Sequence, residues 1–395
     1  MVTSLSVNRR KFMLAAGGAT AGAATGLVPA VALADDKAMP DYAAWKDKDA
    51  LIVHTANTME TRREAMGAPS ITPSAELYIR NNLPAPPTSI ADDPDAWEIA
   101  IEGVKNPGTV TLGDLKPYGV HTVACVLQCS GNGRLFFGHE TSGTQWGVGA
   151  AGNVMWTGIP FKTVVDAMGG PADGMKYLTG TGGEELPAGI DPNTIMVERS
   201  VPIEALDEAL IVYEMNGEAL PVAHGGPARL VAPGYFGVNN VKYVKRLALT
   251  AKESPAKIQQ SGYRMREVGA GGAPEQPSMF KMNVKSWMTV PMGEAASGRT
   301  VLQGVAMGGT SPVTKVEVST DGGATWKDAP FTGPDLGPYA WRPFALIEDL
   351  APGSYVIASR ASNEAGDTQP KDFPPNHRGY GHNGWDAHAI ELTVS

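Results

Sequence analysis

The stretch 120–134, VHTVACVLQCSGNGR, constrains the fold of this chain more than any other. Its first ten residues are almost all apolar or β-branched and include no turn former, which is typical of a strand buried on both faces. Residues 130–133, SGNG, then end the strand abruptly. We therefore expect Cys129 where a rigid strand becomes an open loop, a common position for a reactive group.

Cys125 and Cys129 are the only cysteines in the chain. On one strand their Cα atoms would lie about 13 Å apart, at ~3.3 Å per residue, whereas a disulfide tolerates at most roughly 7 Å. A disulfide would need a helical stretch, which the β-branched composition disfavours. Cys125, between Ala124 and Val126, fits a buried inert thiol. Cys129, beside a glycine-rich loop that ends in Arg134, fits a reactive thiolate better.

The motif 127–134, LQCSGNGR, resembles the cysteine loop of the sulfite oxidase family, molybdenum enzymes in which one cysteine thiolate binds the metal. Further segments resemble that family in the same order along the chain. The resemblance implies an α+β fold, with a sulfite-oxidase-type molybdopterin domain followed by an immunoglobulin-like β-sandwich dimerisation domain. It also implies that Cys129 is the ligand of molybdenum.

The segment 78–84, YIRNNLP, resembles the family's Arg-Asn-His-Leu-Pro segment, which contacts pterin and substrate. The resemblance assigns Tyr78, Ile79, Arg80, Asn81 and Asn82 to the cofactor site, and Arg80 also to the substrate. Asn82 stands where many members carry histidine. An amide keeps a hydrogen-bond donor but cannot titrate, so an acid–base role at this position is not expected.

The longest resemblance runs from 199 to 246 and includes the runs YEMNG, HGGPAR and PGYFGVNNVK. A cofactor with a terminal phosphate needs fixed cations, and Arg229 and Lys242 supply them. The resemblance places His224, Asn240 and Val241 against the pterin as well.

The substrate pocket implied by the resemblance combines Cys129 with cationic and aromatic side chains. Arg80, Arg134 and Arg378 would form a permanently cationic pocket, because a guanidinium stays charged at any physiological pH. Trp146 would wall the pocket, and Tyr263 would donate a hydrogen bond. These six residues are expected to carry the oxidation of a small sulfur oxyanion.

Several other polar residues have no clear assignment. Glu184, in the glycine-rich turn 180–187, is the nearest acid to the expected pterin site. A three-histidine metal site from His377, His382 and His388 is a further possibility, but the spacing fits no known metal motif, so solvated loop histidines are the simpler interpretation.

The N-terminus reads as an export signal. Residues 9–14, RRKFML, precede a soft apolar run and the small-residue site ALA at 32–34, which resembles a twin-arginine signal peptide and predicts export to the periplasm. No later stretch reads as a membrane span. The expected organisation is a signal peptide, an N-terminal arm, a catalytic domain that includes a helix, a linker and an immunoglobulin-like domain: 1–34, 35–74, 75–267 (helix at 159–168), 268–281 and 282–395.

The C-terminal part alternates in the manner of strands. Val316 and Val318 alternate with polar residues before the hairpin signal DGG at 321–323, and residues 355–357 and 390–394 continue the pattern. This predicts a small antiparallel sandwich. By resemblance, it would also join two copies of the chain into a homodimer.

The net charge and the cysteine content of the chain limit the classes of partner and cofactor that it can be expected to bind. The formal net charge is -9, and removal of Arg9, Arg10 and Lys11 with the signal would give -12. Such an acidic protein is a poor candidate for nucleic acid. There is no Cys-x-x-Cys-His motif, so we expect no haem on this chain, and two cysteines disfavour an iron–sulfur cluster. The expected cofactor is molybdenum–molybdopterin, with sulfite as substrate and a periplasmic c-type cytochrome as the electron acceptor.

Three alternatives remain at this level. A sulfane dehydrogenase subunit of the thiosulfate-oxidising system would share the fold and cofactor but act on a carrier-bound persulfide; the resemblance places its divergence at the arginine after the cysteine loop, so Arg134 favours free sulfite. A methionine sulfoxide reductase of the same superfamily would lack the C-terminal sandwich. A cofactor-free periplasmic binding or adhesion module would contain no molybdenum.

Overall fold

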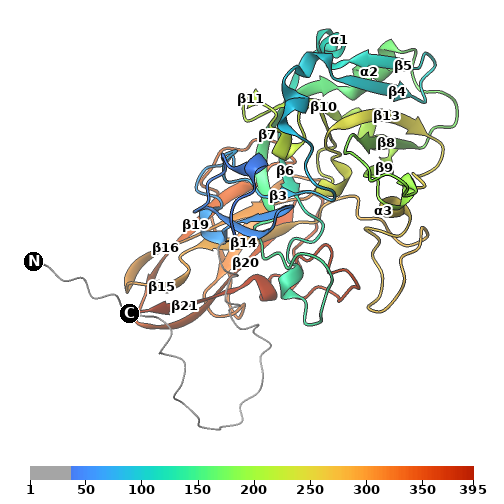
Figure 1. Cartoon of the computed structure of the whole chain (residues 1–395). Coiled ribbons are helices and arrows are strands. Elements are labelled where there is room, and N and C mark those ends of the chain that lie inside the picture. Colours follow the sequence, from blue (N-terminus) through green and yellow to red (C-terminus); the bar gives the residue numbers. More distant parts are fainter. Residues whose placement is uncertain (1–36) are drawn as a thin grey trace, which may run out of the picture. The chain divides into compact units, whose positions relative to one another are not determined.

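The computed structural model describes residues 37–395, which belong to one compact unit (Figure 1). The predicted signal peptide, residues 1–34, lies outside the described residues. Among the residues from 37 onward, no helix is both long and apolar enough to cross a membrane. The fold of the described residues is α+β in the first part and all-β in the last, and residues 37–395 contain three short α-helices: α1 (Leu112–Leu115), α2 (Phe161–Ala167) and α3 (Lys257–Gln260).

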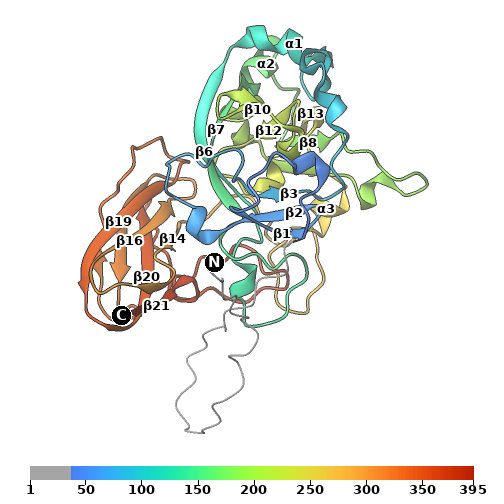
Figure 2. The ribbon, with the colours of Figure 1, turned by 60° about the vertical axis from the view of Figure 1, so that its left-hand side comes forward.

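The sheet that carries the cysteine loop has the order β11-β10-β7-β6, with β12 also paired to β10. Figure 2 shows β6, β7 and β10 side by side. The five strands are β6 (His121–Gln128), β7 (Ala151–Pro160), β10 (Leu210–Met215), β11 (Glu218–Ala219) and β12 (Arg229–Val231).

Strand β6 is buried on both faces over its second half, as its composition predicts, while His121 and Thr122 are exposed. Cys125 and Leu127 pack on one face in a cluster with Trp156. Val126 packs on the other face in a cluster that includes Trp341 of the C-terminal domain. The strand ends at Gln128, so Cys129 is the first residue of the loop.

A second sheet has the order β5-β4-β13-β8-β9, and side chains from its strands pack in a large apolar core. Only β4 and β13 pair in parallel; the other pairs are antiparallel. Its strands are β4 (Glu98–Glu102), β5 (Gly108–Thr111), β8 (Tyr177–Gly182), β9 (Glu198–Pro202) and β13 (Val244–Thr250).

The predicted N-terminal arm is wrong in part, because residues 35–74 contain two paired strands. These are β1 (Leu51–Thr55) and β2 (Thr58–Thr61), and β2 also pairs with β3 (Ile79–Arg80). The strands are short, and a tight turn separates the first two, so their alternation is weak in the sequence. Their consequence for function is direct, since β2 holds the strand that carries Arg80.

The predicted helix 159–168 is shorter than expected. Ile159 and Pro160 extend β7 and pair with β10, and the helix begins only at Phe161. A β-branched residue followed by proline favours an extended backbone, which explains the shift.

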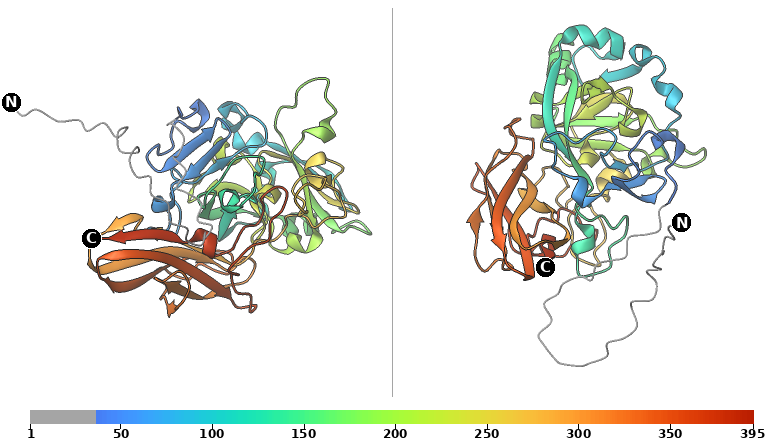
Figure 3. Two further views of the ribbon diagram at one scale, coloured as in Figure 1. Left: turned by 90° about the horizontal axis from the view of Figure 1, so that it is seen from below. Right: turned by 90° about the vertical axis from the view of Figure 1, so that its left-hand side faces the viewer.

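The C-terminal domain is the predicted β-sandwich, and its two layers can be followed as the orange and red strands in Figure 3. The layers have the orders β14-β16-β19 and β15-β21-β20-β17-β18. Val316, Val318 and Ile357 point into the apolar core between them. Its strands are β14 (Lys285–Val290), β15 (Gly293–Ala295), β16 (Gly298–Met307), β17 (Val313–Ser319), β18 (Lys327–Asp328), β19 (Arg342–Leu350), β20 (Gly353–Asn363) and β21 (Ile390–Val394).

Contacts between the two domains lie close to the cysteine loop. Arg63 donates hydrogen bonds to the backbone oxygens of Met288 and His388 at 2.6 Å each. Arg134 donates from Nε to the backbone oxygen of Arg378 at 2.9 Å. The C-terminal segment thus reaches back from the sandwich to the loop that follows β6.

Candidate active site

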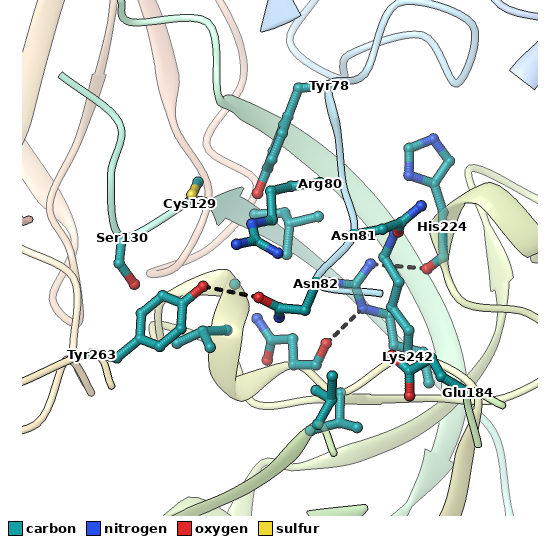
Figure 4. Close-up of a pocket in the computed structure, with 17 residues that line it drawn as sticks. Tyr78, Arg80, Asn81, Asn82, Cys129, Ser130, Glu184, His224, Lys242 and Tyr263 are labelled. Carbon is teal, nitrogen blue, oxygen red and sulfur yellow. Dashed lines mark hydrogen bonds between the residues drawn. The ribbon is translucent and has the colours of Figure 1, made fainter. Parts of the chain in front are cut away.

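Cys129 is held by the end of β6 and the start of β7. Its backbone N–H donates to the oxygen of Ala150 at 2.9 Å. Asn132 braces the loop from inside, because its Oδ1 accepts from the N–H of Ala150 at 3.1 Å and its Nδ2 donates to Gln128 Oε1 at 3.0 Å. The thiol is 8% exposed, and it faces a pocket together with Ser130 and Tyr263 (Figure 4).

Arg134 is fixed by backbone carbonyls rather than by acids. Nη1 donates to the oxygen of Thr144 at 2.7 Å and Nε to that of Arg378 at 2.9 Å. Glycine is required at the positions against which the guanidinium packs. A Cβ on Gly131 would lie 2.4 Å from Nη2, and a Cβ on Gly143, at φ +101°, would lie 2.8 Å from Nη1.

Arg80 lines both pockets together with Cys129 and Tyr263, and it has an unsatisfied donor. Burial lowers its pKa, but the nearby Tyr263, Cys129, Tyr380 and Tyr78 raise it more, so its pKa lies above the usual value. Within the described part of the chain, its buried Nη1 atom has no hydrogen-bond partner. A charged group held this way is ready to bind an anion.

Tyr263 reaches the pocket in a strained backbone conformation, at φ +50°. Positive φ is uncommon for a tyrosine and is found mainly where the surroundings enforce it, often at functional sites. Its ring stacks on Tyr380 at 5.2 Å, and its Oη donates a long hydrogen bond of 3.4 Å to Asn82 Oδ1.

The other end of the pocket is cationic. Lys242 Nζ donates to Asn81 Oδ1 and to the backbone oxygen of Ala223, at 2.6 Å each. Arg229 donates to the backbone oxygens of His224 and Asn240 at 2.9 and 3.1 Å. Figure 4 shows Lys242, His224 and Asn81 grouped away from Cys129 and Tyr263.

Burial dominates the electrostatics at that end. It lowers the pKa of Lys242 well below the usual value, with further lowering by Arg229, and it lowers the pKa of Arg229 to about 10. It also lowers the pKa of His224 well below the usual value, with further lowering by the nearby Lys46 and Lys242. Burial raises the pKa of Glu184 to about 7. An anionic group bound here would stabilise the protonated Lys242 and the charged Arg229.

Two adjoining pockets meet at Cys129. The first has about 620 Å³ of empty space, the second about 700 Å³, and they share Arg80, Asn82, Cys129 and Tyr263. The first is also lined by Tyr78, Asn81, Leu127, Ser130, Glu184, Val197, His224, Arg229, Gly237, Val238, Asn240, Val241 and Lys242. The second is also lined by Arg134, Gly143, Thr144, Trp146, Ser261, Gly262, Arg266, Arg378 and Tyr380.

The first pocket fits molybdopterin. Among the residues described, Ser130 Oγ and His224 Nε2 are buried without a hydrogen-bond partner, and an unmade bond of this kind is costly. A pterin can supply the missing partners. Arg229 and Lys242 suit a terminal phosphate, and the Cys129 thiol suits a soft metal ion at the opposite end.

The predicted site residues come together at these two pockets with one exception. The six proposed catalytic residues, including Trp146 and Arg378, line the second pocket or both. The side chain of Ile79 lines neither and packs in an apolar cluster with Met59 and Ala223. Ile79 therefore positions the neighbouring Tyr78 and Arg80 through the strand rather than through its own side chain.

The structure contradicts the disulfide and the three-histidine site, and it also contradicts the interpretation of His382 and His388 as solvated loop histidines, because both are buried. Both cysteines are free thiols, as the strand geometry requires. His382 Nδ1 lies 3.1 Å from His388 Nε2, but His377 accepts a bond from the N–H of Gly269 instead. In residues 37–395 no group of three or more histidine, cysteine or acidic residues could hold a metal ion.

Sequence reasoning missed several residues that line the pockets, among them Ser130, Gly143, Arg266 and Tyr380. Ser130 stands inside the motif 127–134, directly after Cys129, but was not singled out, and Tyr380 lies two residues after the predicted Arg378. Arg266 follows Tyr263 by three positions, and a basic residue so close to a predicted site residue was the available signal. Gly143 gave no signal beyond its residue type.

Comparison with known proteins agrees with this geometry. Residues 85–258 match the oxidoreductase molybdopterin-binding domain and residues 276–393 the Mo-co oxidoreductase dimerisation domain. The chain is 30% identical over 356 residues to mitochondrial sulfite oxidase of Rattus norvegicus, covering 82% of this chain and 62% of that protein. It is 27% identical over 367 residues to sulfite oxidase of Arabidopsis thaliana, covering 85% of this chain and 92% of that one.

A solved structure is similar over most of the chain. The sulfane dehydrogenase SoxCD from Paracoccus pantotrophus superposes with a TM-score of 0.73 at 27% identity, covering 87% of this chain and 89% of that one. The fold, the pocket and the matched family models define a protein with an oxidoreductase molybdopterin-binding domain and a Mo-co oxidoreductase dimerisation domain. Within that class, the chain belongs to the sulfite oxidase family. It spans about 62% of the length of the mammalian sulfite oxidases it matches.

Proposed function

We propose that this protein oxidises sulfite to sulfate with molybdenum–molybdopterin as its cofactor. The observation that carries the proposal is the second pocket, which adjoins Cys129. Within the described residues, its lining includes four arginines and no aspartate or glutamate. The four are Arg80, Arg134, Arg266 and Arg378. A pocket with this charge selects a small anion, and the sulfur oxyanions sulfite and sulfate belong to that class.

The balanced reaction is sulfite plus water giving sulfate, two protons and two electrons. When bound, the cofactor supplies the two-electron redox centre. The chain's own residues bind and orient the anion: Arg80 offers its unsatisfied Nη1, Arg134 offers a guanidinium fixed by backbone carbonyls, and Trp146 walls the pocket. The Oη of Tyr263 is positioned to donate a hydrogen bond to the anion.

The route of the electrons and the cellular location are part of the proposal. Residues 1–34 resemble a twin-arginine signal peptide, which supports folding in the cytoplasm and export to the periplasm. A periplasmic c-type cytochrome would then accept the electrons one at a time. The match to a dimerisation domain supports a homodimer.

A second candidate is a sulfane dehydrogenase, which would act on a carrier-bound persulfide. The similarity to SoxCD, over 87% of this chain, supports it. The two candidates differ in what must enter the pocket. Sulfite oxidation requires the free sulfite dianion, whereas a sulfane dehydrogenase requires the persulfide-bearing segment of a carrier protein.

Steady-state kinetics on the exported, molybdenum-loaded protein tests the proposal. We expect sulfite to reduce cytochrome c with two cytochromes reduced per sulfate formed. Activity on a persulfidated carrier protein without activity on sulfite would replace the first candidate by the second. A protein that contains no molybdenum and oxidises neither would contradict both.

A further inference from the structure

A buried carboxylate on β2 contacts the chain that holds the cysteine loop, although it lines neither pocket. Glu60 is 5% exposed. Its Oε1 accepts from the N–H of Gly149 at 3.0 Å, and its Oε2 accepts from His54 Nε2 at 2.8 Å. His54 lies on β1, next to β2 in the sheet β1-β2-β3 (Figure 2). A buried charge needs partners of this kind, and these two bonds use both carboxylate oxygens.

The pair of Glu60 and His54 reaches the second pocket through Trp146. The imidazole of His54 lies edge-on to the indole of Trp146, with 5.2 Å between the ring centroids and 80° between the planes. Tyr78 makes a second edge contact with the same indole, at 6.3 Å. Trp146 is buried and lines the second pocket. Aromatic contacts of this kind favour particular ring orientations, so the orientation of the imidazole influences that of the indole.

The same carboxylate fixes the backbone that leads into β7. Gly149 donates to Glu60, and its own oxygen accepts from the N–H of Thr61 at 3.2 Å. The next residue, Ala150, accepts the N–H of Cys129. A Cβ on Gly149 would lie 1.8 Å from the oxygen of Thr61 and 2.7 Å from Cγ of Glu60. Strand β2 therefore packs directly against the segment that supports the cysteine loop.

We propose that Glu60 is a positioning residue of the active site, which sets the orientation of Trp146 through His54 and so shapes the second pocket for its oxyanion. The identity of the oxyanion rests on the proposed function. The positioning itself rests on the contacts of Glu60, His54 and Trp146. Trp146 would wall the bound anion in the ground state and the transition state alike, so loss of its position should raise KM more than it lowers kcat.

Fluorine NMR of the protein labelled with fluorotryptophan reports on Trp146 without turnover. The chain contains eight tryptophans, and the variant Trp146→Phe identifies the resonance. In Glu60→Ala we expect this resonance to move or broaden, because the imidazole that contacts the indole loses its anchor. Glu60→Gln should restore it, since an amide can accept from Gly149 and donate to His54.

The KM for sulfite gives a second readout on the molybdenum-loaded protein. In Glu60→Ala we expect KM to rise about tenfold with a much smaller change in kcat, since misplacement of a group by about 1 Å can cost up to about a hundredfold in efficiency. Glu60→Gln should recover most of the loss. Glu218→Ala is the matched control, because Glu218 is exposed on β11, and it should match the unmodified protein in both measurements.

An unchanged Trp146 resonance in a folded Glu60→Ala variant would overturn the positioning role, and so would a moved resonance with an unchanged KM. A moved resonance in a protein that does not oxidise sulfite would support the positioning and reject the proposed function. If Glu60→Ala fails to fold, Glu60→Asp replaces it, because a side chain one methylene shorter cannot reach both partners. An unchanged resonance and an unchanged KM in Glu60→Asp would then overturn the proposal.

Discussion

Arg80 and Arg134 carry the same charge but are held in different ways. Arg134 donates two hydrogen bonds to backbone carbonyls, and these bonds order the loop. Its side chain also lines the second pocket. Arg80 keeps a buried Nη1 without a partner among the described residues. Substitution of Arg80 therefore separates anion binding from folding more cleanly than substitution of Arg134.

Arg80→Gln should lower kcat/KM for sulfite by about ten- to a hundredfold, because a charge-assisted bond to an anion contributes roughly 1.5–3 kcal/mol. Molybdenum content should not change. The measurement pairs steady-state kinetics with metal analysis, and Arg299→Gln, at an exposed position on β16, serves as the control. Loss of molybdenum in Arg80→Gln would show instead that Arg80 holds the cofactor.

Glu184 gives a pH test. Burial raises the pKa of its carboxyl from the usual 4.5 to about 7 in the folded protein. Between these values the folded state binds the proton that the unfolded state has lost, so stability falls as pH rises from 4.5 to 7 and then levels off.

In the cofactor-free protein, the free energy of unfolding should decrease by about 1–3 kcal/mol less over this pH range in Glu184→Gln than in the unmodified protein. The size follows because one pKa unit corresponds to about 1.4 kcal/mol. Denaturant unfolding at several pH values measures it. Glu185→Gln, on the exposed neighbour, is the control. An identical pH profile for Glu184→Gln and the unmodified protein would place Glu184 in contact with water.

The residues of the site could be predicted only where a motif carried them. Cys129, Arg80 and Lys242 each stand in a motif that resembles the family, and these motifs follow one another along the chain in the family's order. Arg266 and Tyr380 reach the pocket because the segments after α3 and before β21 fold back onto the cysteine loop. That approach depends on packing between segments far apart in the sequence, which no local pattern encodes.

At the scale of elements, β6 and the loop after it act as one unit. Cys129 is held by Ala150, and the loop is closed by Asn132 and by a guanidinium packed on Gly131. Strand β6 was predictable because a run of apolar and β-branched residues favours a buried strand over a helix or a loop. The pairing of β1 and β2 was not predictable, because two short strands in a polar segment show little alternation of apolar and polar residues.

Gly131→Ala should disturb this unit. The added Cβ would lie 2.4 Å from Arg134 Nη2, so the guanidinium must move. We expect kcat/KM for sulfite to fall at least about tenfold, as for loss of one charge-assisted bond. Gly138→Ala is a matched control in a nearby loop, since a Cβ there would meet no atom within 4 Å. Equal kinetics in the two variants would contradict the packing role of Gly131.

At the scale of the whole molecule, charge bears on the proposed electron acceptor. The exported chain would carry a formal charge of -12, from -9 less the three basic residues of the signal. A basic cytochrome would be attracted to such a protein, and its association rate would depend on ionic strength.

Turnover at limiting cytochrome and saturating sulfite should therefore fall as salt rises, because exposed charges are largely screened beyond about 8 Å at physiological ionic strength. Salt also competes for the anion pocket, so saturation with sulfite must be checked at each point. An uncharged acceptor provides the control. A flat profile with a basic cytochrome would argue against attraction between net charges.

The central claim is that the Cys129 thiolate holds molybdenum where the two pockets meet, while Cys125 is a buried inert thiol. Burial raises the pKa of Cys125 to about 12, so it stays protonated at neutral pH. A serine cannot replace a soft thiolate ligand.

The most direct measurement is molybdenum content and sulfate production in Cys129→Ser and Cys125→Ser, purified after export with the signal intact. Cys129→Ser should lose sulfite oxidation, while Cys125→Ser should keep molybdenum and most of its activity. Equal loss in both variants, or full activity in Cys129→Ser, would contradict the assignment.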